Sequence, residues 1–143
     1  MKTPAQRRRG GFSLAELMVV IVIIGLLATL VVPRVVRNLF VANVGKAKAD
    51  IVAIASAVDQ YAIENNGKYP ESLEALVTPD ENGFSYLGQE TVPKDPWGQE
   101  YSYEPPPPGT HEYRVLTYGS DTVPGGEGDA RDIDNIMIRN GEV

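Results

Sequence analysis

A long apolar run dominates the first quarter of the chain. Leu17 to Pro33 contains no charged residue, and extension back to Phe12 gives 22 residues interrupted only by the carboxylate of Glu16. A helix of 22 residues would be about 33 Å long, which is enough to cross the hydrocarbon core of a bilayer. The pattern therefore predicts a membrane-spanning helix near the N-terminus.

Helical periodicity continues beyond this run. Between Val44 and Asn66 apolar residues recur every three or four positions, which is typical of an amphipathic helix. The members of this stripe are Ala47, Ile51, Ile54, Ala55, Val58, Tyr61 and Ala62. Asn66-Gly67 favours a left-handed end to the helix, and Pro33, inside the apolar run, predicts a kink. We expect the stripe to pack on a C-terminal sheet.

The remainder of the chain predicts short elements. Residues 71–77 favour a short helix, and residues 100–103 and 113–118 have the composition of strands. The prolines at 105–108 form a stiff connector between these strands, and Trp97 is expected to anchor the core. The sequence thus predicts an α+β fold in which a long N-terminal helix packs on a small antiparallel sheet.

Charge divides the chain into a basic head, an apolar span and an acidic body. Residues 1–50 carry eight basic and two acidic groups, whereas residues 51–143 carry five basic and seventeen acidic groups. The acidic body argues against nucleic-acid binding, which requires a basic face that displaces counterions. The chain has no cysteine and one histidine, His111, which argues against Cys/His catalysis and against an enzyme.

The basic head has the properties of a leader. It contains Lys2, Arg7, Arg8 and Arg9. The positive-inside rule keeps this end in the cytoplasm. A secretory signal peptide would need a small-residue cleavage site after the apolar run, and residues 30–35 contain none. A permanent membrane anchor is the second interpretation. Gly10 and Gly11, placed before the run, favour a third, in which a protease cuts after Gly11 and leaves the span in place.

Glu16 is the one carboxylate within the apolar run. A carboxylate there costs about 2.5–3.5 kcal/mol on insertion scales unless it is paired or lies near the interface. Cleavage after Gly11 would create an α-amine on Phe12, one helical turn from Glu16. The amine of the same chain or that of a neighbouring copy could pair with the carboxylate, and snorkelling of Glu16 to the interface is the alternative.

The junction between leader and span resembles that of type IV pilins and pseudopilins, in the stretch Arg9-Gly10-Gly11-Phe12-Ser13-Leu14-Ala15-Glu16-Leu17-Met18-Val19-Val20. The resemblance implies that a membrane prepilin peptidase cuts between Gly11 and Phe12 and that Phe12 is then N-methylated. It also implies that Glu16 aligns the incoming subunit during assembly.

The chain closes with a glycine-rich acidic segment at residues 118–135. Its glycines let the backbone turn carbonyl groups inward, and its carboxylates add oxygen ligands of the kind that Ca²⁺ prefers. The segment lacks the alternating acids and the terminal glutamate of an EF-hand. On composition alone, a solvated acidic loop and a calcium site explain it equally well.

The C-terminal half resembles the major pseudopilins of type II secretion systems. The shared features are Asp95-Pro96-Trp97-Gly98, a Tyr-Gly-x-Asp turn at 118–121, a Gly-Gly-Glu-Gly run at 125–128, and Asp132-Ile133. The resemblance covers essentially the whole chain and implies a pilin-like fold with one Ca²⁺ ion. The ligands that it implies are the side chains of Asp121, Asp129 and Asp132 and the carbonyls of Tyr118 and Val123.

This resemblance implies a subunit that polymerises with copies of itself into a periplasmic pseudopilus, which drives folded proteins across the outer membrane. It implies contacts with minor pseudopilins, the prepilin peptidase, an inner-membrane assembly platform and the outer-membrane secretin. The chain then comprises a leader at 1–11, a transmembrane and fibre-core segment at 12–36, and a periplasmic domain at 37–143, and crosses the inner membrane once. A type IV pilus subunit and a membrane-anchored calcium-binding module that does not assemble are the alternatives.

Overall fold

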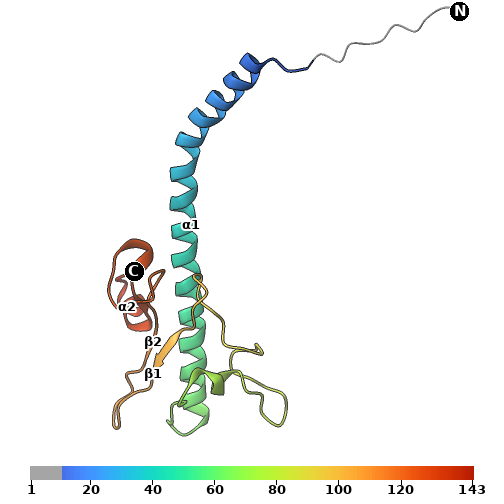
Figure 1. Cartoon of the computed structure of the whole chain (residues 1–143). Coiled ribbons are helices and arrows are strands. Elements are labelled where there is room, and N and C mark those ends of the chain that lie inside the picture. Colours follow the sequence, from blue (N-terminus) through green and yellow to red (C-terminus); the bar gives the residue numbers. More distant parts are fainter. Residues whose placement is uncertain (1–10) are drawn as a thin grey trace, which may run out of the picture. The chain divides into compact units, whose positions relative to one another are not determined.

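The computed structural model describes residues 11–143. The expected basic leader therefore lies outside the described residues, except for Gly11. Contacts divide the chain into two compact units, the first extending to Asn38 and the second comprising Leu39–Val143. Figure 1 shows the order of the elements along the chain.

Helix α1 extends from Leu14 to Glu64 and includes both the expected span and the expected amphipathic helix in one element of 51 residues. Pro33 lies inside it, so the kink expected there does not interrupt the helix. At its C-terminal end, Asn66 and Gly67 have positive φ angles of 56° and 82°. The Gly67 N–H donates to the Ala62 carbonyl at 2.8 Å, which confirms the left-handed end of the helix.

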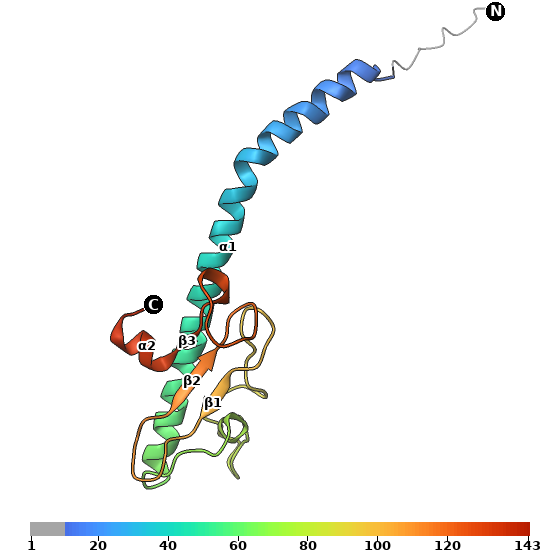
Figure 2. The same ribbon diagram turned by 60° about the vertical axis from the view of Figure 1, so that its left-hand side comes forward.

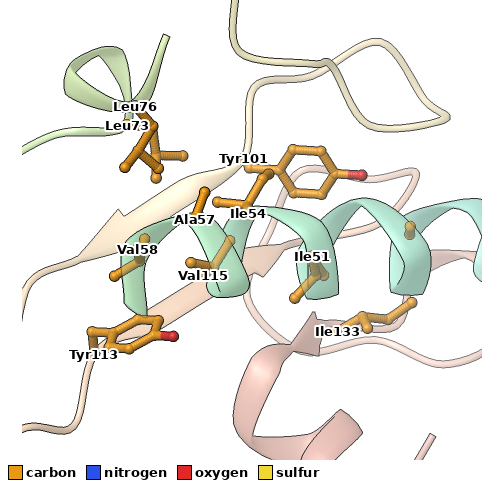
Figure 3. Close-up of a cluster of buried hydrophobic side chains, with 11 residues drawn as sticks. Ile51, Ile54, Ala57, Val58, Leu73, Leu76, Tyr101, Tyr113, Val115 and Ile133 are labelled. Carbon is orange, nitrogen blue, oxygen red and sulfur yellow. The ribbon is translucent and has the colours of Figure 1, made fainter. Parts of the chain in front are cut away.

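The second unit packs around the C-terminal part of α1. Ile51, Ile54 and Val58 have no exposed surface, which confirms the apolar stripe as the core face of the helix. Figure 3 shows these side chains among those of the other core residues, which are Ala47, Ala57, Leu73, Leu76, Tyr101, Tyr113, Val115 and Ile133. Trp97 is half-buried against this cluster, as expected for a core anchor.

A three-stranded antiparallel sheet lies beside this part of α1, with the strands in the order β1-β2-β3 (Figures 1 and 2). The strands are β1 at Ser102–Glu104, β2 at Arg114–Thr117 and β3 at Ile133–Asp134. Tyr103 pairs with Val115, and Thr117 pairs with Ile133. The expected α+β class, with a long N-terminal helix and a small antiparallel sheet, is confirmed.

Several short elements differ from the expectation. β3 has two residues and is followed by helix α2 at Asn135–Asn140, and both are too short to leave a periodic pattern in the sequence. The helix expected at 71–77 is a single 3₁₀ turn, η1, at Leu73–Leu76, and a second such turn, η2, lies at Gly128–Ala130. Glu100, expected in the first strand, forms an isolated bridge with Lys94 across the intervening turn.

Acidic residues of α1 outside the apolar stripe bind tyrosines of the sheet region. The Tyr101 hydroxyl donates to Asp50 at 2.9 Å, and the Tyr113 hydroxyl donates to Asp59 at 2.9 Å. Burial, followed by these carboxylate acceptors, raises the pKa of both tyrosines above the ordinary value. Lys46 adds an ion pair to Asp50. Polar contacts therefore fix the sheet region to the helix on both sides of the apolar core.

Asp134 connects three elements. Its Oδ1 accepts from the Met137 N–H at 2.7 Å, as the N-cap of α2, and its Oδ2 accepts from Arg114 of β2 at 2.7 Å. Burial alone would raise the pKa of Asp134. The hydrogen bonds from Met137 and Arg114 outweigh burial, so the pKa of Asp134 lies below its ordinary value.

Asp134→Asn should make the free energy of unfolding less sensitive to acid. A carboxyl group with a lowered pKa stabilises the folded state above the unfolded-state pKa of about 3.9, and that contribution is lost as the pH falls through the folded-state pKa. Asparagine retains an N-cap acceptor. Urea unfolding followed by Trp97 fluorescence, at about pH 7 and at about pH 3, should therefore isolate the effect of the charge.

Glu104→Gln is the matched control, because Glu104 also faces Arg114, at 3.5 Å, but its side chain is 54% exposed. This variant should keep the acid sensitivity of the native chain, since exposed ion pairs contribute little. Equal destabilisation by Asp134→Asn at both pH values would contradict the assignment to the carboxylate charge.

Candidate assembly and calcium sites

The described part of the first unit is an apolar helix whose side chains are exposed. All residues from Gly11 to Leu39 are exposed. Within residues 11–143, α1 is the one helix that is long and apolar enough to cross a membrane, and none of its most apolar window is buried. An apolar surface of this extent requires lipid or another protein surface around it.

The start of α1 carries a reciprocal capping box. The Ser13 N–H donates to Glu16 Oε2 at 2.8 Å, and the Glu16 N–H donates to Ser13 Oγ at 3.2 Å. Two backbone N–H groups without helical partners are satisfied in this way. The Ser-Leu-Ala-Glu spacing in the sequence indicates this capping role. From the sequence, only an assembly role was expected for Glu16.

The residues expected in processing and assembly are accessible. Phe12 is 82% exposed, and Gly11 has no atom within 4 Å of the position that a Cβ would take. Glu16 is exposed, and its Oε1 accepts no hydrogen bond from residues 11–143. Gly11 and Phe12 could therefore enter a protease site, and Glu16 has one carboxylate oxygen open to a partner.

A series of buried hydrogen bonds fixes the beginning of the acidic loop. Asp95 accepts hydrogen bonds from the N–H groups of Trp97 and Gln99 at 3.0 and 2.7 Å, and from the Thr117 hydroxyl at 2.5 Å. Thr117 Oγ1 in turn accepts from the Gly119 N–H at 3.2 Å. Sequence reasoning used the Asp-Pro-Trp-Gly motif only as a family signature. Its structural role is to connect the turn at 95–98 to the start of the loop.

The loop closes on itself at positions where only glycine fits. Gly119 has a φ of 70°, and a Cβ there would lie 2.6 Å from the Asp129 carbonyl. A Cβ on Gly126 would lie 2.3 Å from the Ala130 carbonyl. The Ser120 N–H donates to the Asp129 carbonyl at 2.8 Å. Close backbone approach explains these two glycines of the acidic segment.

Asp132 fits a cation ligand. Its Oδ2 accepts from the Gly125 N–H at 2.9 Å, whereas its Oδ1 is buried and has no hydrogen-bond partner. A buried carboxylate oxygen without a donor is unfavourable unless a cation or water satisfies it. The carbonyl oxygens of Tyr118 and Val123 also accept no hydrogen bond from residues 11–143. The loop therefore contains unengaged oxygen atoms of the kind that Ca²⁺ binds.

The three expected carboxylates are not gathered into one cluster. Among residues 11–143, no group of three or more Asp, Glu, His or Cys side chains is arranged to hold a metal ion. Asp121 Oδ1 accepts from the Val123 N–H at 3.2 Å, and Asp129 is exposed and closes the loop through its carbonyl. In this arrangement backbone carbonyls would have to supply part of any calcium shell.

Models of two protein families match the chain. The prokaryotic N-terminal methylation motif matches residues 6–32, and type II secretion system protein G matches residues 34–136. The type II secretion system core protein G of Vibrio cholerae is 43% identical, over 94% of this chain and 96% of the relative. The protein of the same name from Pseudomonas aeruginosa is 41% identical, over 91% of this chain and 96% of the relative.

A solved structure is also similar. The crystal structure of the major pseudopilin from the type 2 secretion system of enterohaemorrhagic Escherichia coli matches with a TM-score of 0.50 and 30% identity. The match covers 66% of this chain and 86% of that chain.

Proposed function

Since the chain belongs to the type II secretion system protein G family, we propose that it polymerises as the major pseudopilin into a pseudopilus that drives folded proteins across the outer membrane. The observation that carries this function is the uncovered apolar half of α1. Copies of the same helix are a suitable cover, because the ridges of apolar side chains on one helix pack into the grooves of another. Members of the family are structural subunits, and we infer that assembly rather than catalysis is the activity of this chain.

The two alternatives have less support. The match to protein G extends over residues 34–136, and this favours a pseudopilin over a type IV pilus subunit. The methylation motif at residues 6–32 favours a processed subunit over a membrane-anchored calcium-binding module that does not assemble.

Processing is the first proposed step. A prepilin peptidase cuts between Gly11 and Phe12, and Phe12 is then N-methylated. The methylation motif and the exposure of both residues support this step. Cleavage removes the basic leader but keeps the apolar helix, so the mature chain stays in the inner membrane with its C-terminal body in the periplasm.

Alignment by Glu16 is the second proposed step. The carboxylate binds the α-amine of Phe12 on a neighbouring copy, while Oε2 continues to cap its own helix. The open Oε1 and the exposure of Glu16 support this pairing. In hydrocarbon surroundings an unpaired carboxylate is unfavourable, so the pair forms most readily where two helices lie side by side.

Glu16→Gln should abolish fibre formation while leaving cleavage intact. Glutamine still accepts a hydrogen bond from the Ser13 N–H, so the capping box survives, but the charge that attracts the neighbouring amine is gone. The readout is the yield of assembled fibres isolated from the cell envelope, together with the intact mass of the membrane-bound chain as the measure of cleavage.

Ser13→Ala is the matched control, because it removes the Ser13 Oγ acceptor and leaves the Glu16 charge in place. Loss of the cap should cost about 1 kcal/mol of helix stability and leave fibres largely intact. Normal fibres from Glu16→Gln, with reduced fibres from Ser13→Ala, would assign Glu16 to capping and contradict its role in alignment.

The remaining partners follow from the family. We propose that the chain contacts minor pseudopilins at the fibre tip, an inner-membrane assembly platform at the fibre base and the outer-membrane secretin during export. Membership of the protein G family supports these contacts at the level of the whole machinery.

Calcium binding is proposed for the loop at residues 118–135. The buried Oδ1 of Asp132 carries the proposal, with Asp121 and the carbonyls of Tyr118 and Val123 as further ligands. Asp129 completes the proposed set through its exposed carboxylate. Bound Ca²⁺ would stabilise only the folded loop, which is useful to a small body that has no disulfide.

Asp132→Asn should remove most of the calcium-dependent stability. Calcium at a hundredfold excess over its Kd stabilises a folded state by about 2.7 kcal/mol through mass action. Thermal unfolding of the detergent-solubilised chain, with calcium and with chelator, measures this difference as a shift in Tm. Asparagine can still accept from the Gly125 N–H, so the loss reports on the charge of Asp132.

Glu127→Gln is the control for this experiment, because it removes an exposed carboxylate from the same loop. It should keep a calcium-dependent Tm shift close to that of the native chain. Identical melting of the native chain in calcium and in chelator would contradict the calcium site as a whole.

A further inference from the structure

Two arginines follow the apolar run of α1 directly. Arg34 and Arg37 are exposed and lie one helical turn apart, on the same side of the helix as Leu30. We propose that Arg34 and Arg37 bind the phosphate groups of anionic lipids at the membrane surface opposite the leader. The proposal rests on the membrane-spanning role of α1 given above.

The position of the two arginines matches the depth of lipid headgroups. Arg34 lies 22 residues after Phe12, which is about 33 Å along a helix, while the hydrocarbon core of a bilayer is about 30 Å thick. Arg37 lies about 4.5 Å further along the helix axis. Guanidinium groups at this depth reach phosphate oxygens and bind them with paired hydrogen bonds.

The chain offers these arginines no carboxylate of its own. The salt bridges among residues 11–143 involve Lys46 and Arg114 but neither Arg34 nor Arg37. No acidic residue lies between Glu16 and Asp50 in the sequence, and Asp50 is already paired with Lys46. An anion that binds these two exposed positive charges would therefore come from outside the chain.

Lipid phosphate suits this requirement better than a carboxylate of a neighbouring copy. A chain inserted in the membrane before assembly is surrounded by headgroups, and anionic headgroups attract basic residues near the surface by about 1 kcal/mol each. Apart from Glu16, which the proposed alignment engages, the acidic residues of a second copy begin at Asp50, 13 residues beyond Arg37, about 20 Å along a helix. A subunit that leaves the membrane for the fibre must then release the lipid contacts of Arg34 and Arg37.

The absence of cysteine allows a local test in the full-length chain. Leu30, which is 70% exposed, is replaced by cysteine and labelled with bimane, and the chain is placed at low density in phosphatidylcholine vesicles. Quenching by brominated phosphatidylglycerol is compared with quenching by brominated phosphatidylcholine at equal mole fraction. The ratio of association constants should favour phosphatidylglycerol about fivefold per arginine, and should fall with added salt.

Three variants identify the source of this preference. Arg34→Gln/Arg37→Gln should bring the ratio close to one, whereas Arg34→Lys/Arg37→Lys should keep most of it, because lysine preserves the charge. Lys48→Gln/Lys68→Gln removes the same number of charges from positions further along the chain and should behave like the native chain. The basic leader precedes α1 in the sequence, and the start of α1 at Leu14 is 16 residues before the label, about 24 Å along the helix.

If the native chain showed a ratio of association constants of one, the proposal would be overturned. An unchanged ratio in Arg34→Gln/Arg37→Gln would also overturn it. A native ratio of one combined with loss of fibres from the double glutamine variant would assign the arginines to carboxylates of a neighbouring copy. Absence of quenching by both lipids would show that the helix is not inserted, and this outcome would contradict the proposed function together with the lipid site. Because the labelled chain is dilute, a failure of polymerisation alone leaves the measurement unaffected.

Discussion

An apolar helical segment with exposed side chains, at residues 14–39, is the constraint on which the rest of this molecule depends. Every residue from Gly11 to Leu39 is exposed, and most side chains of the segment are aliphatic. Such a surface is stable only within lipid or against other helices. In the proposed precursor, lipid would cover this apolar surface. In the proposed fibre, the helices of neighbouring subunits would cover it. Under the proposed function, one helix would serve as the membrane anchor first and as the polymer core afterwards.

The folded body solves a different problem, because its apolar core is small and no disulfide supports it. Polar contacts reinforce the core at its edges. Tyr101 and Tyr113 bind carboxylates of α1, and the buried Asp95 connects a turn, strand β2 and the acidic loop. In the loop, the buried Oδ1 of Asp132 has no hydrogen-bond partner among residues 11–143, and the proposed calcium ion would satisfy it.

Periodicity in the sequence was sufficient to predict α1, its core-facing stripe and the α+β class, because many residues repeat the same signal. It could not predict β3 or α2, whose positions depend on tertiary contacts of Asp134 and Asn135 rather than on local pattern. The Ser13–Glu16 capping box was readable from spacing alone. By contrast, the roles of Asp50 and Asp59 depend on tyrosines more than fifty residues away in the chain, and no local pattern indicates such pairings.

The intact mass of the subunit purified from assembled fibres tests the central claim most directly. The account predicts a chain that begins at Phe12, carries one additional methyl group and retains the whole of α1, because the uncovered helix itself forms the fibre core. Fibres built from chains that still begin at Met1, or from chains cut beyond the apolar segment, would contradict it.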